Sequence, residues 1–409
     1  MLTRSQQLLG AAVAALLGFG CGDDRGRPAG DAALVDAAVP DVSVPDVAVA
    51  DAAVPDATTQ DASAADAGST DATASGTVLW TVRGPADPGA DSLSTAIAWD
   101  RSGGLWLAGF DHASASESAA WVRRLAPSGT PLWRHTVDVP AARDQFRGVA
   151  ADGSGDAVAV GESNRQLVIQ KLGPSGSVAW TVTTQGFDAR HGEDVVAGGA
   201  GTWVVVGYTL GLEFVVSSRY DAAGTRLQDF GLGTNFCDGS GALRVSRGSS
   251  GDLLIGGFTC RSEFGSSSFL RRAAPDLRPR FNLFDPTLGP IQGVAFAGES
   301  LLVCAREGLH LYSPSGVLIR RIPLGGQCQR IATTPLGDVI TAEVYPDGSA
   351  RVSSLTLAGV LRWQTSYRGA ADLGASPVDL DVASDGTIYV AGSEKTADKQ
   401  IYFVQALAP

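Results

Sequence analysis

The chain has 409 residues, with 51 glycines, one methionine and a formal net charge of −12. Short Val, Ile, Leu and aromatic runs between Gly, Ser, Asp and Pro clusters indicate an all-β protein, and no sustained helical period follows the first twenty residues. Residues 1–76 hold 11 acidic and 3 basic side chains, which leaves a nearly balanced 32 and 28 for the remainder. That balance provides no basic patch, so nucleic acid is excluded as a partner.

The first twenty residues have the pattern of a targeting segment. One basic residue, Arg4, precedes an apolar run from Leu8 to Gly20. About 12 apolar residues are too few to span a bilayer as a helix, whereas a short run that ends at a small residue is typical of a secretory signal peptide. We therefore predict that residues 1–20 are a signal peptide and that the protein is exported.

Cys21 comes directly after this segment. The stretch Leu17-Gly18-Phe19-Gly20-Cys21 resembles the lipobox of bacterial lipoproteins, although Gly18 stands where leucine is usual. The resemblance implies that Cys21 is lipidated after cleavage, and Gly22 after the cysteine implies the outer membrane, on its periplasmic side or at the cell surface. The alternative is an ordinary cleaved signal peptide with an unmodified cysteine.

An aspartate recurs at every fifth position between residues 31 and 71, with Ala, Val, Pro, Ser and Thr in between. A period of five places the carboxylates on neither one helical face nor one strand face, and the segment has no aromatic residue to bury. A flexible ladder would have to be ordered before it bound calcium, which makes that alternative the weaker one. We predict that residues 21–75 form a disordered Asp/Ala/Pro/Val linker that tethers the C-terminal part of the chain.

Seven copies of one unit occupy the chain after residue 76. Each copy is a strand of small residues, a turn that contains glycine and a more apolar strand, as in "GVAADGSGDAVAVGE" (148–162) and "LDVASDGTIYVAGS" (380–393). The turn glycines are Gly103, Gly155, Gly201, Gly251, Gly298, Gly337 and Gly386. Their separations of 39 to 52 residues, with about four short strands per unit, are typical of β-propeller blades.

A second hairpin is recognisable in five of the copies, for example in "VIQKLGPSGSVAW" (168–180). A glycine supplies its tight turn, because glycine adopts positive φ without steric cost. Trp133, Trp180 and Trp363 each come four residues after that glycine, on the expected outer strand. Recurrence at one structural position predicts that these tryptophans pack between blades and do not bind a ligand.

The two ends of the repeat region complement each other. The final "YFVQALAP" matches "WVRRLAPSG" (121–129) as far as the proline, and "SGTVLW" (75–80) supplies the missing continuation. A strand from the start of the domain therefore completes the last blade, which closes the ring and removes an open sheet edge. We predict a single seven-bladed β-propeller that spans residues 76–409.

This stretch resembles the bacterial seven-bladed β-propeller repeat lipoproteins, and its Gly-x-x-x-Trp outer strands are similar to pyrroloquinoline-quinone-type propeller repeats. The resemblance covers residues 76–409 and implies the fold. It implies less about function, because such propellers serve as binding platforms, as assembly factors and only sometimes as enzymes. The adjacent cysteine pair of the quinone enzymes is missing, so no cofactor is predicted.

Four cysteines besides Cys21 lie in the propeller region, an even number that indicates disulfides in an oxidising compartment. Cys237 and Cys260 flank the first two strands of the fourth copy, and Cys304 and Cys328 flank the boundary between the fifth and sixth copies. Three connectivities are possible, of which we favour 237–260 with 304–328. The absence of a Cys-x-x-Cys spacing argues against a structural zinc site.

The sequence shows no recognisable catalytic or metal site. His112, His135, His191 and His310 have no paired metal-ligand spacing, and no Gly-x-Ser-x-Gly elbow is present. A Ser-His-Asp triad assembled in space remains an open alternative. The acidic turns at Asp152–Asp156 and Asp385–Gly386 occupy the shared hairpin position, where Asp and Gly favour the turn geometry itself over calcium binding.

Irregular insertions interrupt the regular repeat at Asp111–Ala120, Asp138–Gln145, Gln185–His191 and Gly231–Gly241. Our first hypothesis is a non-catalytic, monomeric propeller that presents these loops to a protein, a glycan or another envelope component and meets the membrane only through its lipid anchor. The second is a glycan lyase or hydrolase, which requires two carboxylates or a His-carboxylate pair in one pocket. The third is an outer-membrane assembly factor.

Overall fold

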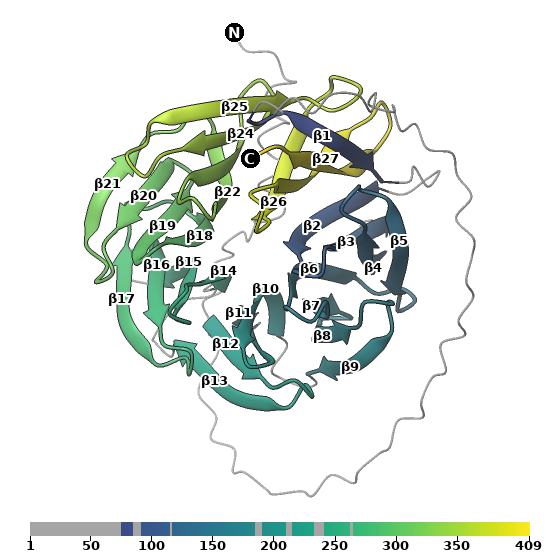
Figure 1. The fold of residues 1–409 in the computed structure, drawn as a ribbon. Helices are drawn as coiled ribbons and strands as arrows, with labels where there is room; N and C mark the ends of the chain where they lie inside the picture. The colour runs from purple at the N-terminus through teal and green to yellow at the C-terminus, as the bar shows by residue number, and fades with distance from the viewer. Residues whose placement is uncertain are drawn as a thin grey trace, which may run out of the picture. The chain divides into compact units, whose positions relative to one another are not determined.

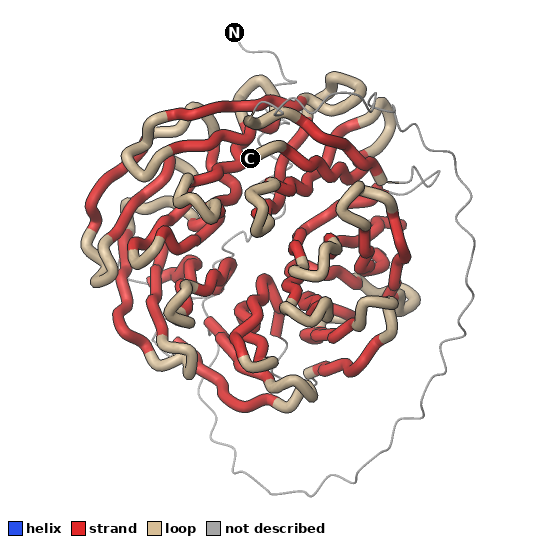
Figure 2. Tube along the Cα trace, viewed as in Figure 1, coloured by secondary structure: helices blue, strands red, loops and turns tan. Residues whose placement is uncertain are grey.

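The computed structural model describes residues 75–84, 91–114, 117–184, 190–209, 215–232, 241–261 and 265–409. These residues form 28 strands in seven four-stranded antiparallel sheets, and no helix. Figure 1 shows the sheets as seven blades around a common axis, and Figure 2 shows the connections between strands as short loops. The predicted all-β, seven-bladed propeller is confirmed.

Each blade runs outward from an inner strand next to the axis to an outer strand at the rim. Blade 1 contains β2 (Asp91–Trp99), β3 (Leu105–Ser114), β4 (Glu117–Leu125) and β5 (Pro131–Val137). Blade 2 contains β6 (Asp144–Ala151), β7 (Ala157–Ser163), β8 (Gln166–Leu172) and β9 (Val178–Thr183). Blade 3 contains β10 (Arg190–Gly199), β11 (Thr202–Thr209), β12 (Val215–Tyr220) and β13 (Arg226–Leu232).

The remaining blades have the same order. Blade 4 contains β14 (Gly241–Arg247), β15 (Leu253–Arg261), β16 (Gly265–Ala273) and β17 (Pro279–Asp285). Blade 5 contains β18 (Ile291–Ala297), β19 (Ser300–Ala305), β20 (Gly308–Tyr312) and β21 (Leu318–Ile322). Blade 6 contains β22 (Gln327–Thr333), β23 (Val339–Val344), β24 (Ala350–Leu355) and β25 (Leu361–Tyr367). Blade 7 contains β26 (Ala375–Val382), β27 (Ile388–Lys395), β28 (Gln400–Leu407) and, as its outer strand, β1 (Val78–Arg83).

The ring closes in the predicted way. Strand β1 pairs antiparallel with β28, with Trp80 opposite Ala406 and Val82 opposite Val404. Strand β1 therefore supplies the fourth strand of blade 7 and pairs with the edge of β28 that would otherwise be open.

The apolar core lies between blades rather than inside them. Seven clusters of buried apolar side chains occupy the seven interfaces, and each cluster draws residues from two neighbouring blades. In the cluster between blades 7 and 1, for example, Leu107 and Trp121 pack with Tyr389 and Tyr402. Neighbouring blades therefore bury apolar surface that neither would bury alone, which couples the blades in folding.

The outer tryptophans also lie between blades, as predicted. The indole nitrogen of Trp133 donates to Pro174 O at 2.8 Å, and that of Trp180 donates to Ala222 O at 2.8 Å. Each indole covers the turn glycine of the next blade so closely that a Cβ there would lie within 3.0 Å of the ring, as at Gly176 and Gly224. Trp363 covers Gly76 in the same way and connects blade 6 to the closing strand.

The connections divide the propeller into two faces. Because the strands of each blade alternate in direction, all turns between first and second strands and between third and fourth strands lie at one end, which we call the turn face. The connections between second and third strands and between blades lie at the opposite end, the insertion face. The predicted irregular insertion at 111–120 is mostly strand, because β3 extends to Ser114 and β4 begins at Glu117. The insertion at 138–145 joins β5 to β6 on the insertion face. The insertions at 185–191 and 231–241 lie mostly outside the described residues.

Candidate functional site

Every inner strand carries a β-bulge at the same level. The register of the inner strand against its neighbour shifts between Ser94 and Ala96 in blade 1, and shifts at the equivalent place in the other six blades. A bulge leaves one residue unpaired and changes the direction of the side chains beside it. The residues at and after the bulges therefore form one ring around the axis.

Polar members of this ring bridge all seven blade interfaces, and we call them the inner girdle. Thr95 Oγ1 donates to Phe146 O at 2.7 Å, Arg147 Nη1 to Glu193 Oε1 at 3.0 Å, Val245 N to Asp194 Oδ2 at 2.9 Å, Arg244 Nε to Gln292 O at 3.0 Å, Arg330 Nη1 to Gln292 O at 2.9 Å, Arg330 Nε to Asp379 Oδ1 at 3.2 Å and Ile97 N to Asp379 Oδ2 at 2.9 Å. Each inner strand ends its sheet, and five of these seven contacts satisfy a backbone group of an inner strand.

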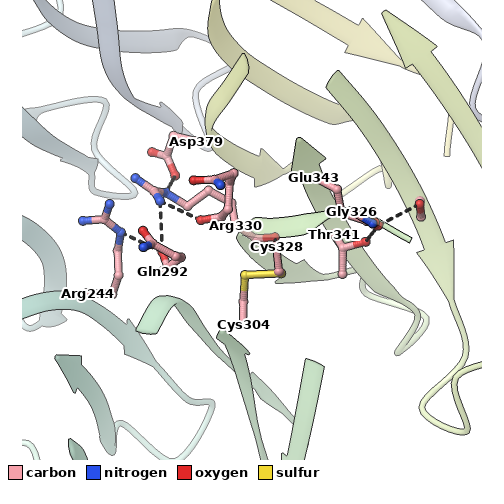
Figure 3. Close-up of a disulfide and its surroundings, with 11 residues drawn as sticks. Arg244, Gln292, Cys304, Gly326, Cys328, Arg330, Thr341, Glu343 and Asp379 are labelled. Carbon is pink, nitrogen blue, oxygen red and sulfur yellow. Dashed lines mark hydrogen bonds and ion pairs between the residues drawn. A yellow bond between two sulfur atoms is a disulfide. The ribbon is translucent and has the colours of Figure 1, made fainter. Parts of the chain in front are cut away.

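Like charges come close together in the girdle. Figure 3 shows Arg244 and Arg330 extending toward the same carbonyl of Gln292, with Asp379 beside Arg330. Burial, reinforced by Arg244, lowers the pKa of Arg330 to about 10. Burial raises the pKa of Asp194 to about 6, against the opposing effect of Arg244. The side chains of Arg330 and Asp379 are still 12% and 22% exposed, so water reaches this level of the axis.

Asp381 lies on the same strand as Asp379. Its Oδ2 accepts the amide of Trp99 at 2.7 Å, which adds a second contact between β26 and β2. Burial raises the pKa of Asp381 to about 6 despite this hydrogen bond.

A disulfide joins blades 5 and 6 beside the girdle (Figure 3). Cys304 on β19 and Cys328 on β22 are bonded, with their Cα atoms 5.6 Å apart, and both side chains are fully buried. The predicted 304–328 pair is therefore present. Cys237 lies outside the described residues, and the 237–260 pair stays a prediction.

A second polar cluster connects blades 2 and 3 near the insertion face. His191 Nδ1 contacts Glu162 Oε2, Arg147 pairs with Glu193, and the ring of Tyr208 stacks on His191 at 4.9 Å between centroids. Burial acts to raise the pKa of Glu162, but His191 and then Arg147 outweigh it, and the resulting pKa lies below the ordinary value. The charge of Glu193 raises the pKa of Arg147 against the effect of burial.

The pair His191–Glu162 is of the kind that the enzyme hypothesis requires. A small cavity of about 10 Å³ adjoins His191 and is lined mainly by apolar residues such as Leu167 and Val205. That volume holds about one water molecule, whereas pockets for small-molecule ligands measure about 300–1,000 Å³. His191 Nε2 has no hydrogen-bond partner among the described residues. The cavity beside this pair is too small to admit a sugar.

The other residues singled out from the sequence do not converge on one site. His112 lies on β3, His135 Nε2 lies 3.1 Å from Gln170 Oε1, and His310 is buried on β20. Within the described part of the chain, no three His, Cys, Asp or Glu side chains are arranged to hold a metal ion. Asp152 Oδ1 accepts Ser154 N at 2.8 Å, so it stabilises its own turn as predicted. Cys21 lies outside the described residues.

The loop between β5 and β6 packs against the start of β4 on the insertion face between blades 1 and 2. Ser118 N, at the start of β4, donates to Ala142 O at 3.1 Å, and Ala141 N donates to Glu117 Oε1 at 3.2 Å. Val139 N donates to Asp144 Oδ2 at 2.5 Å, which fixes the loop at its base. Residues 138–141 and Arg143 stay exposed above these contacts. The segment 138–143 is a held loop with a free outer surface, the arrangement that lowers the entropic cost of binding a partner.

No helix in the described residues is long and apolar enough to cross a membrane. No family model matches the chain, and no curated protein matches it. Solved structures do match. The WD40 domain of Neurospora crassa Pan2 is similar over 81% of this chain and 95% of that chain, with a TM-score of 0.56 and 11% identity. BamB from Moraxella catarrhalis covers 76% of this chain and 85% of that chain with a TM-score of 0.47 and 13% identity, and a protein of unknown function from Bacteroides caccae covers 56% and 79% with 0.41 and 14%. At these identities the Pan2 domain shows the propeller fold and nothing more specific.

Proposed function

We propose that this protein is an envelope-tethered propeller that binds a protein, a glycan or another envelope component through its insertion face. In this proposal residues 1–20 direct export, lipidated Cys21 anchors the chain at the outer membrane, and residues 22–75 form the tether. The propeller is a monomeric binding or scaffold module and carries out no chemistry itself.

One observation carries the proposal: the loops of the two faces differ in their regularity. The turn face consists of short turns at equivalent positions, with positive φ at glycines such as Gly129, Gly176 and Gly224. The insertion face carries the irregular loop between β5 and β6, which is held to the start of β4 through Ser118 and Ala142. Irregular loops on a rigid scaffold are where proteins concentrate recognition.

The girdle supports binding rather than catalysis. Its charged side chains are occupied with each other and with backbone groups of neighbouring blades, as the contacts of Arg330 and Asp379 show. A rigid ring holds the loops above it at constant separations, which favours a preorganised binding surface.

The test is affinity capture from envelope extracts with the immobilised propeller. Val139→Glu together with Arg143→Glu changes two exposed residues of the held loop, and we expect the variant to lose the component that the wild-type domain retains. Ser128→Glu and Ser175→Glu, exposed on the turn face, form the matched control and should retain it. Retention that is equal in all three proteins, or no specific retention by the wild type, would overturn the proposal.

A further inference from the structure

The Gly-x-x-x-Trp spacing of the outer strands encloses three residues whose role the packing of the tryptophan does not explain. These residues come after the turn position of each blade, and together we call them the rim: 77–79, 130–132, 177–179, 225–227, 278–280, 317–319 and 360–362. All 21 are exposed, whereas the residue after each triplet is half-buried in six blades. The spacing therefore places an exposed triplet next to each inter-blade contact.

Thirteen of the 21 rim residues are apolar, and none is a carboxylate. Ten of the 14 exposed large apolar residues in the described part of the chain belong to it, among them Val317 (63% exposed), Val360 (62%), Ile319 (56%) and Leu132 (55%). Two more, Leu336 and Leu357, lie in turns of the same face. The insertion face has two in its described residues, Val139 and Leu373. Single exposed apolar residues are ordinary, but this concentration on one face is not.

The rim lies on one circle. In every blade the pairing between the outer strand and its neighbour shifts register just after the turn. In blade 7 the shift lies between Val78 and Trp80 of the outer strand, and in blade 5 it lies opposite Leu311 and Tyr312 of β20. The third rim residue is the bulged one, and it is Leu79, Leu132, Ala179, Leu227, Arg280, Ile319 or Arg362. Equivalent positions of a ring of similar blades lie in one plane across the axis, so a flat surface can meet many of them together.

The chain enters the propeller at this same circle. Residues 1–74 are connected to the fold through Ser75 and Gly76, and Gly76 occupies the turn position of blade 7 directly before rim residues Val78 and Leu79. An anchor at Cys21 would therefore be joined to the propeller at the turn face. The rim also contains four arginines, whose long apolar stems lie along an interface while their charged ends stay in water.

We propose that the turn face rests on a phospholipid bilayer, with the apolar rim side chains inserted at the boundary between headgroups and acyl chains. This contact adds to the lipid anchor, which the sequence alone predicted as the sole link to the membrane. It does not depend on the binding function assigned to the opposite face, and it orients that face away from the bilayer. Interfacial binding increases with the apolar area that is inserted, so blades 5 to 7, which carry Ile319, Leu361 and Leu79, contribute most.

The test is sedimentation of the propeller with vesicles of phosphatidylethanolamine and phosphatidylglycerol. The assay uses a protein of residues 75–409, which contains all 28 strands. It lacks Cys21, so a lipid anchor cannot contribute to its binding. We expect this protein to sediment with the vesicles, and we expect Leu79→Ser/Ile319→Ser/Leu361→Ser to reduce the partition coefficient at least about tenfold. All three residues are exposed, so the variant should fold like the wild type.

Val139→Ser/Leu373→Ser is the matched control, since it removes exposed apolar side chains from the insertion face, and it should bind like the wild type. The proposal is wrong if the wild type stays in the supernatant or if the two variants bind equally. Size-exclusion chromatography tests whether the rim instead contacts a second copy of the protein. A wild type that self-associates through the rim without binding vesicles would show that the rim is an interface between copies and would overturn the membrane contact.

Discussion

The amide of Gly76 donates to Ala408 O at 2.9 Å, which is the bond that Gly129 makes to Ala126 O in the unbroken turn of blade 1. The amide of Ala408 likewise donates to Thr77 O at 2.9 Å, as Ala126 donates to Thr130 O at 2.8 Å. The closing turn of blade 7 is thus an ordinary turn of this propeller that lacks one peptide bond, between Pro409 and Ser75.

This relationship predicts that the propeller tolerates circular permutation. A protein in which Pro409 is joined directly to Ser75, and the chain is opened between Ser175 and Gly176 in the equivalent turn of blade 2, should fold with the circular dichroism spectrum of residues 75–409. Both turns are exposed and have the same geometry, so the rearrangement moves a chain break without removing a strand.

Deletion of β1 is the informative comparison, because it exposes the edge of β28 and uncovers Trp363. The protein that begins at Asp91 should lose cooperative thermal unfolding. If the permutant fails to fold while the β1 deletion folds normally, closure of the ring by β1 is wrong.

The outer tryptophans should stabilise the ring through both packing and a hydrogen bond. Trp180 covers Gly224 and donates to Ala222 O. Trp180→Ala should lower the free energy of unfolding by about 2–3 kcal/mol, less than for a fully buried tryptophan. Trp180→Phe keeps most of the packing and should cost about 1 kcal/mol for the lost hydrogen bond. Urea titration measures both, with the exposed rim residue Val178→Ala as the control; equal losses in all three variants would contradict a specific role for the indole.

The sequence predicted what depends on short-range pattern. The turn glycines, the outer tryptophans and the split turn all repeat at fixed spacing, so they could be aligned without a structure. The outer hairpin of blade 4 was missed because Leu277, not glycine, occupies its turn position with φ 64°. Its side chain is buried among the core residues between blades 3 and 4, and that burial offsets the strain of a left-handed backbone.

The inner girdle was not predicted, because its members share a position and not a residue type. Thr95, Arg147, Asp194, Arg330 and Asp379 each lie at or just after a bulge, and a bulge inserts a residue without leaving a signature in the sequence. A weak signal does exist. In each copy the inner strand has a Val, Ile or Leu after the bulge, and at least one of the two residues before it is polar.

The disulfide should contribute to stability. Cys304 and Cys328 close a loop with a sequence separation of 24 residues across a blade interface. Cys304→Ala/Cys328→Ala should lower the free energy of unfolding by about 3 kcal/mol in the chain-entropy account. Peptide mapping without reduction should recover the 304–328 pair, and it also tests the predicted 237–260 pair. Free thiols at Cys304 and Cys328 in the exported protein would contradict the structure.

Asp381 of β26 and Asp194 of β10 should make stability fall as pH rises through a defined window. The native pKa values of Asp381 and Asp194 are raised to about 6 from an ordinary value of 3.8. Between these values the native state holds protons that the unfolded chain has released, so the free energy of unfolding decreases with increasing pH.

Asp381→Asn keeps an oxygen acceptor for Trp99 N but cannot ionise. Urea titrations at pH 4, 5, 6 and 7 should show a flatter pH dependence for this variant than for the wild type. Asp385→Asn, in an exposed turn of the same blade, should keep the wild-type slope. A wild-type slope in Asp381→Asn would mean that the titration of Asp381 makes no contribution to stability in this range.

The central claim is that the two faces of the propeller meet different surroundings, and photo-crosslinking in intact cells tests it most directly. A photoreactive amino acid at Arg143, on the held loop of the insertion face, should give an adduct with one discrete envelope component. The same amino acid at Ile319, on the rim, should give adducts with phospholipid. The account is contradicted if the position at Arg143 yields no adduct, or if both positions capture the same partner.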